Sequence, residues 1–476
     1  MGVIFKKRKL SEFQTDYLLR LDSKFHIDFK DYDWDIFHTK SKNLIPLKEL
    51  LEPYYVVFKY EDGKEYKGIP TGREYIDEFG YITSFQTVSK ENHPGRLKYQ
   101  ADNDCILLSS LKGAITPSLN FDFDLSEYVF SNGFYIFKPK NGNNKKFLLH
   151  LLRTKRIKYL IDNVIYRGIG ISAYREDDLL KLKIPKISIE RQNEIAEKVT
   201  PIEQEIKTLK ESKKDILDII NEVFGEEFNI ELEKIEEIDQ KKTFSISLSD
   251  TYKRNSNLRN SLRWNKIQEI QKELYSNISC INKLGNYIIE TKNGWSPSSQ
   301  EGGEGTLILG QEHFNYSGKL KISPSKATEE TKSNISDFYI KNGDFFVSRG
   351  NTVDLVALAS IVQEKIKENI IFPDLYIKIT FKEKYINKEY IALLFNSFLG
   401  RYYFKYVSKG KNQTMVKISS KELNDFYLPV PTKEKQTEIV EKIKSRIDAQ
   451  KNIDKQIEEK QNQISELIDN EIKGVN

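Results

Sequence analysis

The chain has 476 residues, of which 38% are hydrophobic and 12% aromatic; this composition excludes wholesale disorder, and the length predicts more than one domain. No apolar run approaches the ~20 residues needed to cross a bilayer. No apolar stretch of the secretory kind follows the basic start at Lys6, and Cys105 and Cys280 lack metal or redox spacing, so we expect a cytoplasmic protein without a membrane partner. The net charge of +5 is too small to name a partner by itself.

Residues 1–184 read as a first domain of short strands broken by Gly and Asn. The β-rich runs predict strands at Tyr54–Tyr60, Tyr81–Val88, Cys105–Ser109 and Phe134–Lys138, with Lys64–Gly68 in a loop or hairpin. A helix is predicted over Phe147–Leu160, with Phe147, Leu148, Leu151 and Leu152 as its apolar face. Strands plus a helix indicate an α+β domain with an irregular β-rich core.

Residues 185–225, which we call the first stalk, carry a heptad repeat typical of a coiled-coil helix. Its predicted seam residues are Ile195, Val199, Ile202, Ile206, Leu209 and Ile216. Pro201 interrupts this run, and Thr200 and Glu203 have the spacing of a capping box. We therefore expect a break near Thr200, then a long helix that ends at Gly225.

Residues 226–251 read as an acidic linker, with a specific acidic partner surface as the alternative interpretation. Residues 252–428 then repeat the first domain. Leu262-Arg263-Trp264-Asn265 corresponds to Leu19-Arg20-Leu21-Asp22, Asp344 corresponds to Asp104, and an apolar helix face at Tyr390, Ile391, Leu394 and Phe395 corresponds to that of the first helix.

Residues 429–476, the second stalk, repeat the heptad pattern with seam residues at Ile439, Ile443, Ile453, Ile457 and Ile464. Gln192 and Ile195 match Gln436 and Ile439 at a constant separation (436 − 192 = 244). The predicted fold is therefore α+β, with two repeated domains each followed by a long helix of the coiled-coil type. Helices of roughly 35–40 residues at 1.5 Å per residue would span ~50–60 Å.

The sequence offers no catalytic constellation, and we expect no catalytic residue, metal site or cofactor site in this chain. The five histidines are isolated, and there is no HExxH, P-loop or Asn/Asp-Pro-Pro-Tyr motif. Arg167-Gly168-Ile169-Gly170 lacks the βαβ context of a dinucleotide-binding loop and reads as a turn.

Basic and aromatic residues instead gather just before each stalk. Residues 398–421 contain six Lys or Arg and no acid, and residues 138–191 are also strongly basic. Such stretches suit phosphate contact combined with base readout, whereas a solvated Lys-rich surface is the alternative interpretation.

In the second domain we expect the DNA-contacting side chains to have different roles according to their type. Lys409 and Lys411 suit phosphates, Arg349 suits guanine, and Asn412 or Gln413 suits adenine. Arg349 alternatively holds the turn at Gly350. The other candidate DNA-binding residues are Asn351, Thr352, Arg401, Trp295, Ser298, Lys112, Arg73, Arg167 and Tyr174.

The order of these motifs resembles the specificity subunits of type I restriction–modification systems. The resemblance rests on Leu-Arg-Leu-Asp, Gly-Asp followed by a strand and Arg-Gly-Asn, Lys-Gly-Lys-Asn-Gln-Thr, and Leu-Pro-Val-Pro with Gln436. It covers nearly the whole chain; the first half lacks a clear Gly-Asp-strand-Arg-Gly and has Asn103-Asp104-Cys105 instead.

The resemblance implies two target-recognition domains that each read one half of a bipartite double-stranded DNA site. It implies that the two long helices form an antiparallel coiled coil, which acts as a ruler between the domains. It also implies two docked methyltransferase subunits that use S-adenosylmethionine, and often two restriction/translocase subunits that use ATP and Mg. Two alternatives are a structural or adaptor coiled-coil protein and a specificity subunit of another DNA-modifying defence system. A self-contained modification enzyme would need a catalytic domain, for which this chain has no room.

Overall fold

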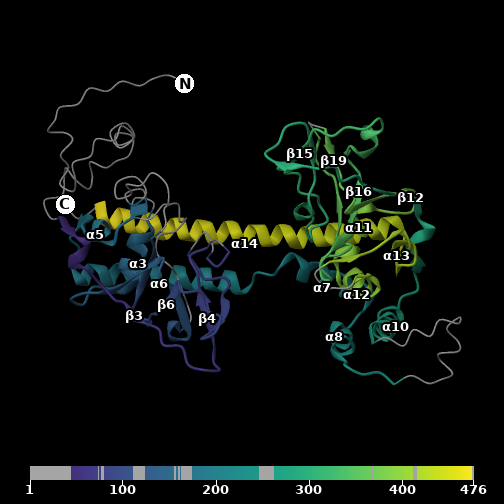
Figure 1. Ribbon diagram of the computed structural model, residues 1–476. Helices are drawn as coiled ribbons and strands as arrows, with labels where there is room; N and C mark the ends of the chain where they lie inside the picture. The colour runs from purple at the N-terminus through teal and green to yellow at the C-terminus, as the bar shows by residue number, and fades with distance from the viewer. Residues whose placement is uncertain are drawn as a thin grey trace. The chain divides into compact units, whose positions relative to one another are not determined.

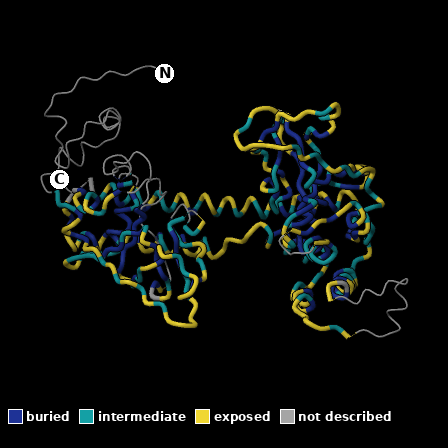
Figure 2. The backbone as a smooth tube through the Cα atoms, in the orientation of Figure 1, coloured by how far each residue is buried: buried dark blue, intermediate teal, exposed yellow. Residues whose placement is uncertain are grey.

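The computed structural model describes residues 44–72, 74–76, 80–110, 124–154, 157–158, 161, 174–245, 262–366, 369–410 and 415–473 (Figure 1). The chain divides into two compact units. Unit 1 combines residues up to Ser212 with the C-terminal segment Asp454–Asn476, and unit 2 comprises Lys213–Ile453. Buried residues concentrate in the interior of each unit (Figure 2).

Unit 1 contains two sheets and a strand pair. A three-stranded sheet has the order β2 (Leu51–Pro53), β9 (Phe134–Pro139), β7 (Ile106–Ser109). A five-stranded sheet has the order β3 (Val56–Val57), β6 (Leu97–Gln100), β8 (Tyr128–Ser131), β4 (Glu65–Ile69), β5 (Gln86–Ser89). Strand β1 (Leu44–Pro46) pairs with β10 (Lys183–Pro185), next to helices α3 (Lys145–Arg153), α5 (Glu176–Leu180) and α6 (Ile189–Glu211).

The strand predictions for unit 1 succeed where the apolar run is long. β7 and β9 confirm the predicted strands at Cys105–Ser109 and Phe134–Lys138. Of the segment predicted as part of a loop or hairpin, Lys64 follows the turn at Asp62 and Gly63, and Glu65–Gly68 belong to β4. Because β4 pairs antiparallel with the next strand, β5, the hairpin alternative is the one that holds; β4 also pairs with β8 on its other side. The predicted apolar face of α3 is confirmed: Phe147, Leu148, Leu151 and Leu152 are all at most 1% exposed.

Unit 2 has a larger core. One four-stranded sheet has the order β12 (Ile288–Asn293), β20 (Tyr376–Phe381), β16 (Phe345–Ser348), β18 (Ala359–Ile361). A second has the order β13 (Gln300–Glu301), β15 (Lys326–Thr328), β14 (Thr306–Ile308), β19 (Ile370–Ile371). The strand pairs are β11 (Ile281–Lys283) with β22 (Tyr427–Pro429), and β17 (Gly350–Asn351) with β21 (Val416–Lys417). The helices are α7 (Ile216–Phe228), α8 (Leu232–Gln240), α10 (Leu262–Tyr275), α11 (Lys388–Asn396), α12 (Phe398–Val407), α13 (Ser420–Asn424) and the first part of α14 (Lys433–Lys473).

The internal repeat is visible in the strand pairing of the two units. The antiparallel pair β1–β10 has its counterpart in β11–β22, and each pair ends in the Ile-Pro or Leu-Pro dipeptide that precedes a stalk. A short 3-10 helix follows each first strand; its Leu47 N–H donates to Leu182 O at 2.9 Å in unit 1, and Leu284 N–H donates to Phe426 O at 2.8 Å in unit 2. The sheet orders β2-β9-β7 and β12-β20-β16 also correspond. The fold is α+β in both halves, as predicted.

The expected break of the first stalk near Thr200 was wrong. Helix α6 runs through Pro201 and ends at Glu211, and α7 begins at Ile216. Pro201 and Glu197, whose carbonyl loses its helical donor, are both exposed, so this carbonyl is not left unpaired in the core. Neighbouring seam residues stay buried, and this packing keeps the helix continuous.

In each unit a stalk helix lies antiparallel beside α14. In unit 1, Arg191 near the start of α6 pairs with Glu471, and Glu205 farther along pairs with Lys460. In unit 2, the end of α7 pairs with the start of α14: Glu227 with Lys435 at 2.9 Å, and Glu226 with Arg446 at 2.8 Å. The antiparallel direction agrees with the prediction.

The segment predicted as an acidic linker is largely folded. Helix α7 continues past Gly225 and ends at Phe228, and its C-cap Asn229 takes the left-handed conformation (φ 50°) that a helix C-terminus favours. Helix α8 follows, with Ile235 and Ile238 buried in the core of unit 2. Because its acids face outward while its isoleucines pack inward, charge alone misled the linker prediction. No helix within the described ranges is both long and apolar enough to cross a membrane.

Candidate nucleic-acid interface

In unit 2 the Gly343-Asp344 motif lies directly before strand β16, and Arg349 lies directly after it. Gly343 has a positive φ of 84°, which only glycine adopts without strain. The Asp344 carboxylate accepts from the Lys341 N–H at 2.8 Å and pairs with Lys378 at 2.6 Å, which fixes the turn. All four residues of β16 are buried, and the side chain of Arg349, directly after them, is partly exposed.

Arg349 is anchored on three sides. Its guanidinium donates to the carbonyl of Asp374 at 3.2 Å and to the Asp374 carboxylate at 3.4 Å. The other carboxylate oxygen of Asp374 accepts from the Ser296 hydroxyl at 2.8 Å. The backbone of Arg349 bonds Leu375 O at 2.7 Å and accepts from Ile418 N–H at 2.9 Å. This arrangement favours the alternative role of Arg349 in holding the turn, and its 28% exposure keeps the guanidinium within reach of a ligand.

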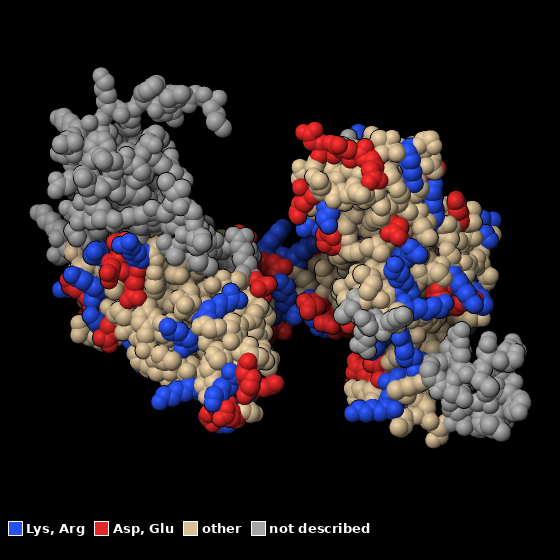
Figure 3. Space-filling view, in the orientation of Figure 1, with Lys and Arg blue, Asp and Glu red and all other residues tan. Residues whose placement is uncertain are grey.

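Lysines lie next to Arg349 because of the strand pair β17–β21. Gly350 and Asn351 pair with Lys417 and Val416, and Lys417 in turn forms a bridge with Lys409. A Cβ at Gly410 would lie 2.6 Å from the carbonyl oxygen of Met415, so a larger residue at this position would clash with the chain. We call Arg349, Lys409 and Lys417 the cationic cluster. Lys and Arg side chains gather over the α12–α13 region on the face of unit 2 drawn in Figure 3.

Lys409 combines an exposed side chain with a buried partner. Its ammonium lies 2.6 Å from Glu422, and the two side chains are 68% and 8% exposed. Burial raises the pKa of Glu422, but hydrogen bonds from Lys409 and Ser419 outweigh this effect, so the pKa of Glu422 is lowered. Glu422 therefore stays ionised and holds Lys409 at the surface.

Gln311 links the cluster to the second sheet of unit 2. Its Oε1 accepts from the Ser348 hydroxyl at 2.7 Å and from Asn351 Nδ2 at 3.3 Å, while its Nε2 donates to Leu375 O at 3.0 Å. Lys417 belongs to the basic stretch recognised from the sequence, but Gln311, Asp374, Ser296 and Glu422 were missed. These four come from separate segments and share no motif, so only the fold brings them together.

Three of the predicted residues lie around this cluster. The Asn351 side chain accepts from the N–H of Thr352 at 2.8 Å, and Thr352 is exposed. The Trp295 ring packs 6.2 Å from Phe338, and its backbone N–H donates to Phe372 O at 3.0 Å.

The remaining loop candidate, Ser298, is exposed next to the second sheet. Its N–H donates to the Glu330 carboxylate at 3.2 Å, and its carbonyl accepts from the Thr328 hydroxyl at 2.7 Å. Its backbone is therefore fixed and its hydroxyl faces solvent.

Two candidates have structural roles that argue against DNA contact. The Arg401 guanidinium donates to the backbone carbonyls of Phe395, Asp354 and Val356, at 3.2, 3.3 and 2.6 Å. Burial lowers the pKa of Arg401 to about 10. Tyr174 is 3% exposed and donates to Ser109 O at 2.7 Å. Arg73, Lys112, Arg167, Lys411, Asn412 and Gln413 lie outside the described residues.

The predicted seam residues divide into buried and exposed positions. Ile195, Val199, Ile202, Ile206, Ile439, Ile443, Ile457 and Ile464 are buried. Leu209 and Ile453 are only partly buried, and Ile216 is 40% exposed, so its seam assignment was wrong. Leu209 and Ile216 flank residues 212–215, where the first stalk is interrupted between α6 and α7. Ile453 lies three residues after Gln450, whose side chain accepts from the Lys214 N–H at 2.8 Å.

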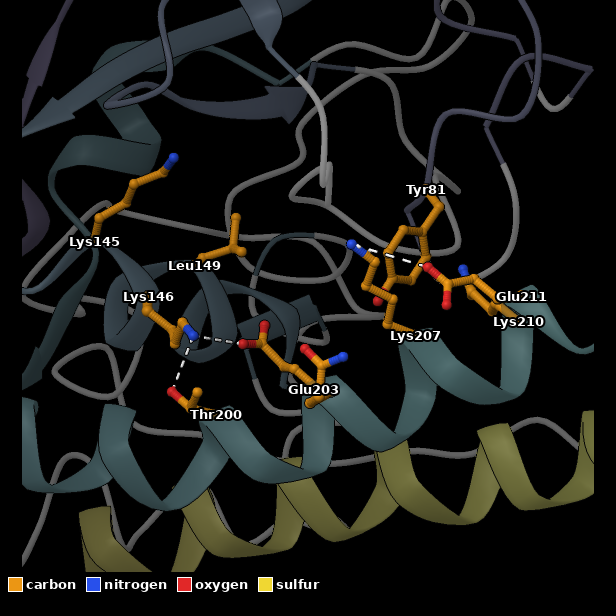
Figure 4. Close-up of a pocket in the computed structure, with 10 residues that line it drawn as sticks. Tyr81, Lys145, Lys146, Leu149, Thr200, Glu203, Lys207, Lys210 and Glu211 are labelled. Atoms are coloured by element: carbon orange, nitrogen blue, oxygen red, sulfur yellow. Dashed lines mark hydrogen bonds and ion pairs between the residues drawn. The ribbon is translucent and has the colours of Figure 1, made fainter.

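Within the described residues, no group of three or more His, Cys, Asp or Glu is placed to hold a metal ion. A cavity of about 350 Å³ in unit 1 lies between α3, α6 and Tyr81, and is lined mostly by Lys and Glu side chains (Figure 4).

Comparison with known proteins assigns the two halves to one family. The model for the type I restriction modification DNA specificity domain matches residues 34–218 and again residues 267–463. No curated protein matches the chain.

Three solved structures are similar at low sequence identity. A chain from a type I R-M system assembly is 14% identical, with TM-score 0.48 over 92% of this chain and 99% of its own. The HsdS subunit from Thermoanaerobacter tengcongensis is 15% identical, with TM-score 0.37 over 91% and 97%. The S subunit from M. genitalium is 11% identical, with TM-score 0.34 over 92% and 97%. Because the family model matches both halves and most of the chain, the protein belongs to the type I restriction–modification DNA specificity family.

Proposed function

We propose that this chain is the DNA-reading subunit of a type I restriction–modification complex, with one recognition domain in each half and one half-site for each domain. The observation that carries the proposal is the cationic cluster. The β17–β21 pair brings Arg349 and two lysines together at the surface, directly after a buried strand. Fixed cations suit phosphates, and a guanidinium can fork to the O6 and N7 atoms of guanine.

We infer that α14 sets the distance between the half-sites. It has 41 residues and contributes its first part to unit 2 and its last part to unit 1. At 1.5 Å per residue a helix of this length spans roughly 60 Å. This is more than the ~34–36 Å of one turn of B-DNA, so two readers joined by such a helix would contact separated half-sites.

The chemistry in this proposal belongs to partner subunits. Two methyltransferase subunits would dock on the stalks and use S-adenosylmethionine to modify adenine, and in complexes that cut DNA two restriction/translocase subunits would use ATP and Mg. This chain would supply recognition and geometry without catalysis, in the cytoplasm.

A mobility-shift titration tests the proposal. The chain is reconstituted with its methyltransferase, and binding is compared for a duplex with the methylated motif and for duplexes with one half-site scrambled. We expect each scrambled half to weaken binding at fixed salt. Equal binding to all duplexes, or no binding to DNA, would instead favour an adaptor role.

A further inference from the structure

The two recognition domains are joined to their stalks through equivalent positions of opposite charge. In unit 1 the joint lies between α3 and α6, and in unit 2 between α11 and α14. Positions on α3 and α11 correspond at a separation of 243 residues, so that Lys146 matches Glu389 and His150 matches Leu393. Positions on α6 and α14 correspond at 244 residues, so that Thr200 matches Lys444 and Glu203 matches Ile447.

In unit 1 the domain contributes the cation and the stalk the anion. The Lys146 ammonium lies 2.8 Å from the Glu203 carboxylate and 3.0 Å from the Thr200 hydroxyl. The close-up shows Lys146 on α3 pointing toward these two residues of α6 (Figure 4). His150, 5% exposed, contacts the other Glu203 oxygen through Nε2 at 2.7 Å.

In unit 2 the charges are reversed. Glu389 on α11 accepts from Lys444 on α14 at 2.7 Å, and the side chains are 29% and 37% exposed. Gln363 also donates to Glu389, and Glu441 lies 3.2 Å from Lys444. Leu393 is 5% exposed, and Ile447 packs against the same core, so this joint has an apolar contact where unit 1 has the pair of His150 and Glu203.

We propose that this reversal matches each recognition domain to its own stalk and disfavours the exchanged pairing. With the domains exchanged, Lys146 would face Lys444, and His150 would face Ile447 without a hydrogen-bond partner. Glu389 would face Glu203, which would lose both of its present partners. Both exchanges therefore place like charges together at a partly buried joint, where repulsion and lost hydrogen bonds add. This inference does not depend on what the domains bind.

A full-length chimera tests the inference. Residues 44–187 are duplicated in place of residues 281–431, so that a second Lys146 faces Lys444. A matched chimera also carries Lys444→Thr and Ile447→Glu, which recreate the stalk residues of unit 1. We expect the matched chimera to melt several degrees higher and to resist proteolysis better. Equal melting of the two chimeras would overturn the inference.

Charge reversal in the otherwise unchanged chain keeps the test decisive if neither chimera folds. Glu389→Lys and Lys444→Glu should each lower the melting temperature by about 2–4 °C, and the double variant should recover most of the loss. Additive losses in the double variant would contradict the proposal. The matched control reverses Lys451 and Asp448, an exposed pair on the same helix with side chains 69% and 68% exposed, and should change the melting temperature little.

Discussion

Gln192 and Gln436 are buried at equivalent positions of the two stalk helices, at 1% and 0% exposure, and share two equivalent hydrogen bonds. Each accepts from the backbone N–H of the residue that caps the domain helix: Asn144 at 2.9 Å and Asn387 at 2.8 Å. Each also donates to a carbonyl just before its own helix, Ile187 at 3.0 Å and Pro431 at 2.9 Å. One amide in each unit thus fixes the angle between domain and stalk.

Replacing the amide should destabilise the joint. Gln436→Leu keeps the volume but leaves Asn387 N–H and the carbonyls of Tyr385 and Pro431 without a partner, since both carbonyls accept from Gln436. Because an unsatisfied buried group costs about 1–3 kcal/mol and these groups are only partly buried, we expect a loss of about 1–3 kcal/mol in unfolding free energy in all. Denaturant unfolding measures it, with exposed Gln463→Leu as the control on the same helix. A loss no larger than that of the control would refute the assigned role.

The contacts of these two glutamines show which features can be predicted from the sequence and which cannot. The repeat at Gln192 and Gln436 is visible as a constant separation, and helical periodicity predicts that the neighbouring Ile195 and Ile439 are buried. The hydrogen-bond partners of the amides come from segments about 50 residues away, and no local pattern reveals them.

Arg401 was wrongly chosen as a DNA-binding candidate for the same reason, because contacts between separate segments decide its role. Arg401 lies in a basic, aromatic stretch, yet its guanidinium is taken up by three backbone carbonyls that meet only in the fold. Composition shows which charged residues are present, whereas packing in the folded chain decides which of them remain accessible.

The stalk assignment predicts unequal effects at two isoleucines. Ile206 is 1% exposed, so Ile206→Asp buries an unpaired charge and should cost about 3 kcal/mol or more. Ile216 is 40% exposed at the first position of α7, where an acid is favoured, so Ile216→Asp should be nearly neutral. Thermal unfolding and co-purification with the methyltransferase measure both variants. Equal losses would show that the described burial is wrong.

The residues of the cationic cluster should have different roles in DNA binding according to their side-chain type. Lys409 is a flexible, exposed point charge, so Lys409→Ala should weaken binding to all duplexes and lower the salt slope by about one. Arg349→Ala should cost about 1–3 kcal/mol, mainly on the cognate duplex. Titrations of cognate and scrambled duplexes at several salt concentrations separate the two effects.

The Arg349 experiment also decides between its two roles. The hydrogen bonds to Asp374 hold the loop that follows β19, so a purely structural arginine would affect all duplexes alike. An equal loss on both duplexes for Arg349→Ala would therefore leave it a structural residue.

The joint of unit 1 predicts a defined acid sensitivity. Burial raises the pKa of Glu203, but His150 and Lys146 outweigh it and lower that pKa from 4.5 to about 2. A lowered carboxyl pKa contributes stability that is present above pH 4.5 and is lost as the pH falls toward 2. Burial also lowers the pKa of His150, so its contribution likewise fades as the pH falls below its ordinary value.

Glu203→Gln should remove the carboxyl part of this sensitivity. Between pH 6 and 3.5 the wild-type chain should lose roughly 1–2 kcal/mol more unfolding free energy than the variant. Urea unfolding at the two pH values provides the comparison, with exposed Glu197→Gln on the same helix as the control. Parallel losses in wild type and Glu203→Gln would rule out this origin of the pH dependence.

The most direct test of the central claim is sequencing of methylated adenines in DNA modified by the chain with its methyltransferase. Residues 252–427 are replaced by the equivalent region of a relative that keeps an acid at the position of Glu389, so that the joint with Lys444 is preserved. We predict a bipartite motif in which one half changes and the other stays the same. A change in both halves, or in neither, would contradict one recognition domain for each half-site.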